Sequence, residues 1–267
     1  MALNHHDSNL VHKVITSFNK AVDQPYLKQF LGRPEVSDSY ISSLLFLFGD
    51  TDLREEDIHD AVLTTLLVQT ALDTHERINR HGLGSERVRT ERQLTVLAGD
   101  YYSALYYFIL SRCKNSKLLH ALSLGIQNVN EAKMSIYHSR DDGEGLGYRD
   151  LQTAYTGIAE ALAKSYDLFD RSGAVTDFLL LRALLNEKKK YSQNQMSIAS
   201  KYIESSTDIR KQGISVEAGF EELIDDILEQ FSKGDAQYGN FQTQYPVFLN
   251  EIHEQRKYCN TYAVEEG

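Results

Sequence analysis

One polar segment of this 267-residue chain has side chains that could bind a metal or an anion, and it reads Asp73-Thr-His75-Glu76-Arg77-Ile-Asn-Arg80. Carboxylates gathered on one helix face can hold a divalent cation through their oxygens, but here arginines stand among them. Side chains at i and i+4 share a helix face, so Asp73 would pair with Arg77 and Glu76 with Arg80. The segment therefore predicts a salt-bridged helix face and no metal site.

A second polar step, Gly99-Asp100-Tyr101, interrupts the apolar run over residues 94–110. Glycine inside a helix costs about 1 kcal/mol relative to alanine, and a buried aspartate costs more unless it is paired or hydrogen-bonded. We therefore expect another helix to approach closely at Gly99 and a specific partner for Asp100. The tyrosines of this run could fill the core or an interface between subunits, and both possibilities stay open for Tyr101, Tyr102 and Tyr106.

Several arginines in and after the first polar segment allow two interpretations. They could contact a diphosphate, because guanidinium groups match phosphate oxygens, or they could pair with neighbouring carboxylates, which we favour. The arginines are Arg77, Arg80, Arg87, Arg89 and Arg92, and the carboxylates are Asp73, Glu76, Glu86 and Glu91.

Other motifs are weaker. Glu56 and His59 form a single ExxH pair, whereas a di-iron bundle needs two such pairs with further glutamates. No HExxH sequence and no phosphate-binding GxxxxGK[ST] loop occurs. Asp225 and Asp226 lie in an amphipathic segment with other acidic residues, which predicts a solvated acidic face rather than a metal site.

Composition limits the class of protein. The formal net charge is −10, and no dense stretch of lysine and arginine supplies the basic face typical of nucleic-acid or anionic-membrane binders. Cys113 and Cys259 lack CxxC spacing, which argues against a disulfide scaffold or a structural zinc site. The N-terminus lacks a secretory pattern, and no run of about 18 apolar residues predicts a transmembrane helix. We therefore expect a cytoplasmic protein.

Proline and periodicity predict an all-α fold. Residues 35–245 contain no proline, which helix interiors exclude, and apolar residues recur at spacings of three and four. The segments 62–72 and 94–110 are apolar nearly all round, which is typical of a bundle interior or a subunit interface. We expect one helical domain over 1–267, with mobile residues 1–8. The expected nine or ten helices are 9–23, 37–48, 53–80, 90–112, 115–138, 148–168, 173–189, 193–211, 215–233 and 243–259.

Residues 69–75 and 92–101 give the sequence a resemblance to the trans-prenyl diphosphate synthases. Within that family it is most similar to the small-subunit group, heptaprenyl diphosphate synthase component 1. The resemblance implies an isoprenoid-synthase-like helical bundle. Catalytic members carry a Leu-x-His-Asp-Asp-x-x-Asp motif, and aligning its histidine with His75 places Glu76, Arg77 and Arg80 at the three aspartates. The second aspartate motif of the family would fall in residues 177–187, which contain no acidic triad.

The resemblance therefore implies a non-catalytic subunit that works in a heterodimer with a catalytic prenyl diphosphate synthase subunit. Such a complex condenses isopentenyl diphosphate onto farnesyl diphosphate for the menaquinone side chain. Mg²⁺ is expected in the catalytic partner, with no cofactor in this chain, which could contact the growing prenyl tail and help set product length. Two alternatives stay open: a helical adaptor unrelated to isoprenoids, and a self-sufficient synthase that uses Asp73, Glu76 and Asp100.

Overall fold

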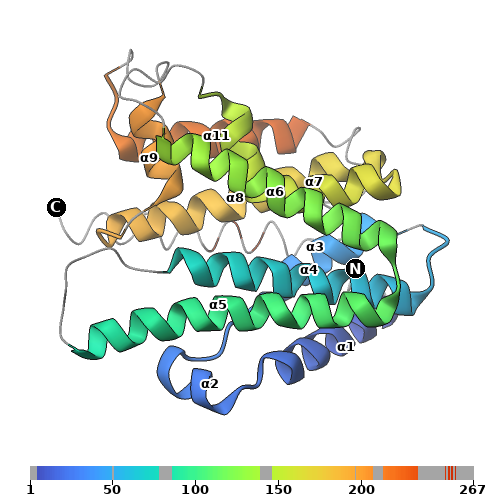
Figure 1. Cartoon of the computed structure of the whole chain (residues 1–267). Coiled ribbons are helices and arrows are strands. Elements are labelled where there is room, and N and C mark those ends of the chain that lie inside the picture. The colour runs from blue at the N-terminus through green and yellow to red at the C-terminus, as the bar shows by residue number, and fades with distance from the viewer. Residues whose placement is uncertain are drawn as a thin grey trace. The chain divides into compact units, whose positions relative to one another are not determined.

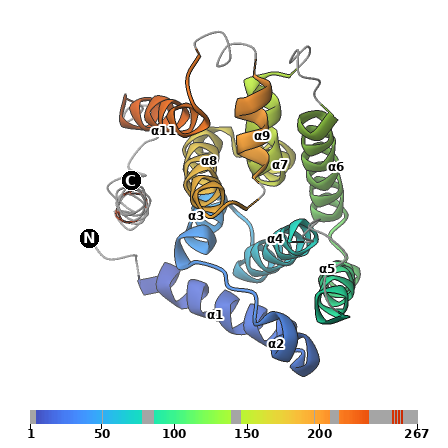
Figure 2. The ribbon, with the colours of Figure 1, turned by 90° about the vertical axis from the view of Figure 1, so that its left-hand side faces the viewer.

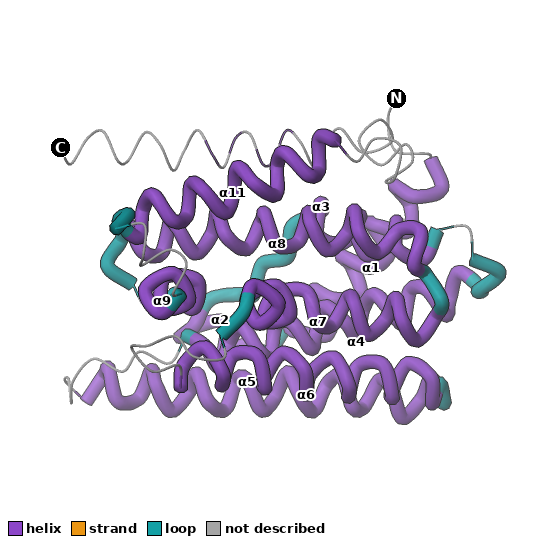
Figure 3. The backbone as a smooth tube through the Cα atoms, turned by 90° about the horizontal axis from the view of Figure 1, so that it is seen from above, coloured by secondary structure: helices purple, strands orange, loops and turns teal. Residues whose placement is uncertain are grey.

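The computed structural model describes residues 5–49, 51–77, 86–138, 146–195, 197–206 and 213–233, with 250, 252, 254 and 256 (Figure 1). All regular structure in these residues is helical, as the tube view shows (Figure 3), so the predicted all-α class is confirmed. No helix among them is long and apolar enough to cross a membrane. The helices are α1 (His5–Val22), α2 (Pro25–Leu31), α3 (Asp38–Phe48), α4 (Glu55–Glu76), α5 (Glu86–Cys113), α6 (Ser116–His138), α7 (Tyr148–Tyr166), α8 (Phe169–Ser192), α9 (Ile198–Ser205) and α11 (Val216–Lys233).

Helix α2 is absent from the sequence-based expectation, which placed no helix between residues 23 and 37. Pro25 is the first residue of the helix, where a missing N–H costs nothing. The Gln24 side chain accepts a hydrogen bond from the Leu27 backbone N–H at 2.6 Å, which caps the helix start. Gly32 ends the helix with φ of +76°, a conformation that favours glycine. Local capping thus produces a short helix that periodicity alone could not reveal.

The chain groups into two compact units, residues 3–122 and 123–267, each described separately here. The single domain expected from sequence stays a prediction. In the first unit, α4 lies along α5, and α1, α2 and α3 pack against this pair (Figure 2). Residues 61–68 of α4 are all buried, which confirms the internal position expected for the apolar segment 62–72.

In the second unit, α8 contacts α7, α9 and α11. Part of α6 also belongs to this unit and approaches α7 closely: a Cβ built on Gly125 would lie 2.8 Å from the Ile158 Cα. The Glu187 carboxylate on α8 is buried. It accepts hydrogen bonds from the Ile198 backbone N–H at 2.8 Å and from Lys190 Nζ at 2.5 Å. The Glu187 side chain therefore links the end of α8 to the first turn of α9 by a buried hydrogen bond.

Candidate functional site

The first polar segment lies at the C-terminal end of α4. The helix ends at Glu76, and Arg77 is its C-cap residue, so the helix is shorter than the expected 53–80. Arg80 lies outside the described residues, so the predicted Glu76–Arg80 pair stays a prediction. The structure places His75 and Glu76 in the last helical turn, four residues earlier than the expected end of the helix at residue 80.

The predicted pair between Asp73 and Arg77 is wrong. Asp73 Oδ1 instead accepts a hydrogen bond from Gln69 Nε2 at 2.7 Å, one turn earlier on the same helix. Arg77 has no ion pair with a carboxylate in the described part of the chain. The physical reason is the end of the helix: Arg77 follows the last helical residue, so the i, i+4 geometry of an uninterrupted helix does not hold there.

The predicted close approach at Gly99 is confirmed, because the His75 ring of α4 lies directly over it. A Cβ on Gly99 would sit 2.4 Å from His75 Cε1. The partner expected for Asp100 is also this histidine, with 3.8 Å between His75 Nε2 and Asp100 Oδ1. The expected burial of Asp100 is wrong, since its side chain is 67% exposed. This pair is therefore accessible to water and adds little stability.

The three tyrosines of α5 have different surroundings. Tyr102 and Tyr106 are buried, and burial raises the pKa of both phenols. Tyr101 is half-buried, and its ring meets that of Tyr102 edge-on at a centroid distance of 5.7 Å. Burial of Tyr102 and Tyr106 favours the core over an interface for these two residues.

Helix α5 also exposes an apolar stripe, which we define as Leu97, Tyr101, Ala104 and Phe108. The spacings of four, three and four residues place these side chains on one helix face. Leu97 is 59% exposed and Phe108 is 58% exposed, and Tyr107 beside them is exposed as well. The segment 94–110 is thus buried on only one side, whereas its sequence is apolar nearly all round. Composition alone could not show which of its residues face solvent.

Two arginines at the junction of α4 and α5 line one cavity. Its volume is about 460 Å³, and it is lined by residues of α2 and the segment after it, the end of α4 and the start of α5. The arginines are Arg77 and Arg92. The predicted pairing of arginines with nearby acids holds for Arg87, whose Nε lies 3.1 Å from Glu91 Oε1.

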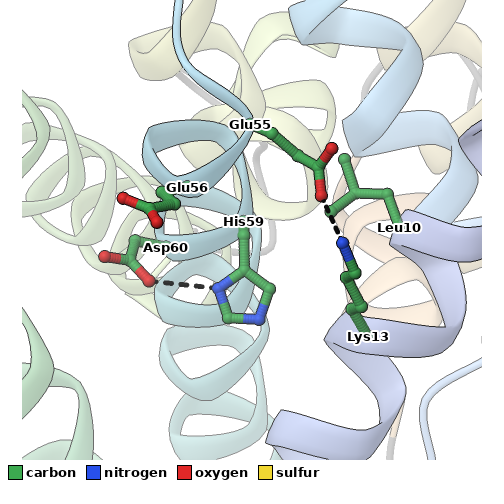
Figure 4. A pocket seen from close by; sticks show the side chains of 6 residues that line it. All are labelled: Leu10, Lys13, Glu55, Glu56, His59 and Asp60. Atoms are coloured by element: carbon green, nitrogen blue, oxygen red, sulfur yellow. Dashed lines mark hydrogen bonds and ion pairs between the residues drawn. The ribbon is translucent and has the colours of Figure 1, made fainter.

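A second polar cluster joins α1, α4 and α5 and borders a cavity of about 280 Å³ (Figure 4). The Asp60 carboxylate accepts a hydrogen bond from the Cys113 thiol at 3.0 Å and lies 3.1 Å from His59 Nδ1. Since a carboxylate only accepts, Nδ1 donates to Asp60, while Nε2 is hydrogen-bonded to the Ser17 hydroxyl at 3.0 Å. Both ring nitrogens of His59 therefore contact protein atoms.

Cys113 provides a chemical test of this cluster. Burial, together with the Asp60 carboxylate, raises the pKa of the Cys113 thiol to about 12. In a Cys259→Ser background, we expect alkylation by iodoacetamide at pH 8 to be about a thousandfold slower than for an ordinary thiol, because only the thiolate reacts. The rate should rise about tenfold per pH unit up to pH 10. A plateau between pH 8 and 10 would contradict the raised pKa, and Asp60→Asn should speed the reaction.

The acidic residues of the two later segments, 177–187 and 223–229, have other partners or face solvent. Glu187 is buried and used by Ile198 and Lys190, while Asp225 accepts a hydrogen bond from Arg256 at 2.6 Å. Asp225 and Asp226 are exposed, as predicted for a solvated acidic face. Among the described residues, no group of three or more histidine, cysteine or acidic side chains could hold a metal ion.

The arrangement of helices defines the fold. It is similar to the crystal structure of octaprenyl pyrophosphate synthase from Helicobacter pylori, with a TM-score of 0.52 over 99% of this chain and 95% of that chain. The sequences are 13% identical, so this likeness shows the fold alone. The fold is an all-α isoprenoid synthase fold, as the sequence predicted.

The particular family follows from the sequence match. Residues 24–233 match the family described as heptaprenyl diphosphate synthase (HEPPP synthase) subunit 1, and the chain belongs to this family. Heptaprenyl diphosphate synthase component 1 of Geobacillus stearothermophilus is 29% identical over 137 residues. That alignment covers 51% of this chain and 60% of the relative, so it spans less than two thirds of the relative's length. The resemblance stated from residues 69–75 and 92–101 is confirmed.

Proposed function

We propose that this chain is the non-catalytic subunit of a two-subunit heptaprenyl diphosphate synthase. In this proposal a separate subunit supplies the catalytic aspartates and binds Mg²⁺. The complex condenses isopentenyl diphosphate onto farnesyl diphosphate and makes the side chain of menaquinone. Family membership supports the assignment to such a synthase, and the names of the relative and of the family, component 1 and subunit 1, support the existence of a second subunit.

The proposal that this chain is non-catalytic rests on the side chains at the end of α4. Binding of Mg²⁺ to a diphosphate needs several free carboxylate oxygens on one face. Here Asp73 already accepts from Gln69, His75 faces Asp100, and Arg77 brings a positive charge to the site. These residues do not fit a magnesium ion, so we assign no catalytic step to this chain.

The apolar stripe of α5 supports the proposed contact with the catalytic subunit. Large exposed apolar side chains on one helix face are typical of protein–protein interfaces when they gather in a patch, and aromatic residues are enriched in the cores of such interfaces. Contact between this stripe and the partner would let the chain shape the space that the growing prenyl tail occupies. A role in setting product length follows from that contact.

Reconstitution with separately purified subunits tests the proposal. The chain and a synthase subunit carrying the Asp-Asp-x-x-Asp motif would be assayed alone and mixed, with farnesyl diphosphate and labelled isopentenyl diphosphate. We expect prenyl transfer only in the mixture, with a seven-isoprene product measured by mass spectrometry. Turnover by this chain alone would contradict the proposal, as would a product length that does not depend on it.

The alternative of a helical adaptor unrelated to isoprenoids makes a different prediction in the same experiment. An adaptor would leave the rate and product length of the synthase subunit unchanged, and the two proteins would not co-elute in size-exclusion chromatography. Magnesium-dependent release of diphosphate by this chain alone would instead favour a self-sufficient synthase that uses Asp73, Glu76 and Asp100.

A further inference from the structure

A serine, a histidine and an aspartate form a chain of hydrogen bonds between α1 and α4. Ser17 Oγ on α1 lies 3.0 Å from His59 Nε2, and Asp60 Oδ1 lies 3.1 Å from His59 Nδ1. Ser–His–Asp hydrolase sites connect the same atoms in the same order, and they occur on unrelated folds, where geometry identifies them. Ser17 therefore has the contacts of a nucleophile with a neighbouring base.

The Asp60 carboxylate fixes the orientation of the His59 ring. Its Oδ1 faces His59 Nδ1, and its Oδ2 accepts a hydrogen bond from the Cys113 thiol at 3.0 Å. Because a carboxylate only accepts, Nδ1 donates, and in the neutral ring Nε2 then carries the lone pair that faces Ser17. A base in this position can take the proton of the Ser17 hydroxyl.

Lys13 adds a positive charge on the same side of α1 as Ser17. The two residues are four positions apart and so share a helix face. Both face α4, because Lys13 Nζ lies 2.6 Å from Glu55 Oε1 and Ser17 contacts His59 (Figure 4). A cation fixed beside a nucleophile can stabilise the oxyanion that forms when a carbonyl carbon is attacked.

The cavity beside these residues limits the substrate to a small molecule with a positive charge. Its volume is about 280 Å³, and the buried Leu10 gives it an apolar wall. Its lining residues include three carboxylates, from Glu55, Glu56 and Asp60, against the single ammonium group of Lys13. The excess negative charge favours a cationic ligand.

We propose that Ser17, His59 and Lys13 form a hydrolytic site for small carboxylic esters that carry a positive charge. Ser17 Oγ bonds to the carbonyl carbon while its proton passes to His59 Nε2. The bond between that carbon and the alcohol oxygen then breaks, and the alcohol leaves with this proton. A water molecule attacks the acyl-serine by the same route, which releases the acid and restores Ser17. Asp60 is a positioning residue that acts through His59.

This activity is separate from prenyl transfer, in which the chain takes no catalytic part. The site uses no residue from the end of α4 or from the apolar stripe of α5. The experiments below use the full chain alone, so failure of the reconstitution assay would leave their results unaffected.

Covalent labelling tests whether Ser17 is activated. Diisopropyl fluorophosphate reacts with activated serines, and mass spectrometry of peptides locates the label. We expect one label per chain, on Ser17, with none in Ser17→Ala and a rate at least about 100-fold lower in His59→Gln, since the general base is lost. Thr16→Ala, at the exposed neighbouring position on α1, is the matched control and should react like the unmodified chain. A label on Cys113, or spread over several serines, would overturn the proposal.

Ester hydrolysis tests the substrate class. Acetylcholine carries a positive charge, and 3,3-dimethylbutyl acetate has the same shape with carbon in place of the charged nitrogen. We expect kcat/KM to be about tenfold higher for acetylcholine, because the carboxylates attract its charge. Lys13→Met should lower kcat at least about tenfold, since the oxyanion loses its cation. Equal turnover of the two esters would contradict a cationic substrate.

Two further variants separate chemistry from folding. Asp60→Asn keeps the shape of the side chain, and we expect it to lower kcat about 100-fold while KM changes little, because the His59 ring loses its orientation. Ser17→Cys keeps a nucleophile and should still form an acyl-enzyme. Thermal unfolding would check that each variant is folded. Unchanged labelling and turnover in a folded His59→Gln variant would exclude the proposed base and with it the site.

Discussion

Replacing Leu97 and Phe108 together with aspartate should abolish stable association with the catalytic subunit and lower the activity of the mixture at least about 100-fold. Both side chains belong to the apolar stripe of α5 and are more than half exposed. In the proposed complex the partner would cover them, so aspartate would bury two unpaired charges in an apolar interface. Loss of a central interface anchor commonly weakens binding by about 2 kcal/mol or more, and two such losses exceed a factor of 100.

The control for this prediction is Phe169→Asp. Phe169 on α8 is 63% exposed, so the change matches Phe108→Asp in chemistry and exposure but lies off the stripe. We expect Phe169→Asp to bind the partner like the unmodified chain, and all variants to unfold at similar temperatures. Association would be measured by size-exclusion chromatography and calorimetry. If the stripe variant still co-elutes with the partner, the stripe is not the interface.

Substitution of Gly125 should have the largest effect on stability. The glycine is buried where α6 approaches α7, and an added Cβ would lie 2.8 Å from the Ile158 Cα and 3.3 Å from the Gly157 carbonyl oxygen. These are backbone atoms of a packed helix, so they cannot turn away as a flexible side chain can. Overpacking lowers the free energy of unfolding by about 1–3 kcal/mol. The higher helix propensity of alanine relative to glycine offsets about 1 kcal/mol of this loss.

We therefore expect Gly125→Ala to lower the free energy of unfolding by about 1 kcal/mol and Gly125→Val by about 3 kcal/mol or more. Urea denaturation followed by circular dichroism would measure both. Ser123→Val, two residues earlier at an exposed position of the same helix, is the control and should change stability by less than about 0.5 kcal/mol. A stabilised Gly125→Ala variant would mean that helix propensity outweighs the contact with α7.

Helix periodicity predicted most of the fold because it depends on residues close together in the chain. The expected helices 37–48, 115–138 and 215–233 agree with α3, α6 and α11 within one residue at each end. Helix α2 was missed because it is short and its start depends on a side-chain cap from Gln24. Short helices of this kind carry too few residues for a periodic pattern to be visible.

The candidate site was harder to predict because it depends on contacts between helices. Glycine in an apolar run did indicate the close approach at Gly99, since few other causes explain it. Sequence spacing also suggested a pair between Asp73 and Arg77, but that inference assumed a helix continuing to residue 80. Nothing in the sequence showed that Arg92 and Phe30 would border one cavity, because they lie on α5 and α2 and meet only through packing.

The buried carboxylate of Glu187 makes the connection between α8 and α9 a poor hinge. A hinge requires backbone dihedral angles that change without breaking buried contacts. Any rotation between these helices would separate Glu187 from the Ile198 N–H and leave a buried charge without its donor. The end of α8 and the start of α9 should therefore open and close as one cooperative unit.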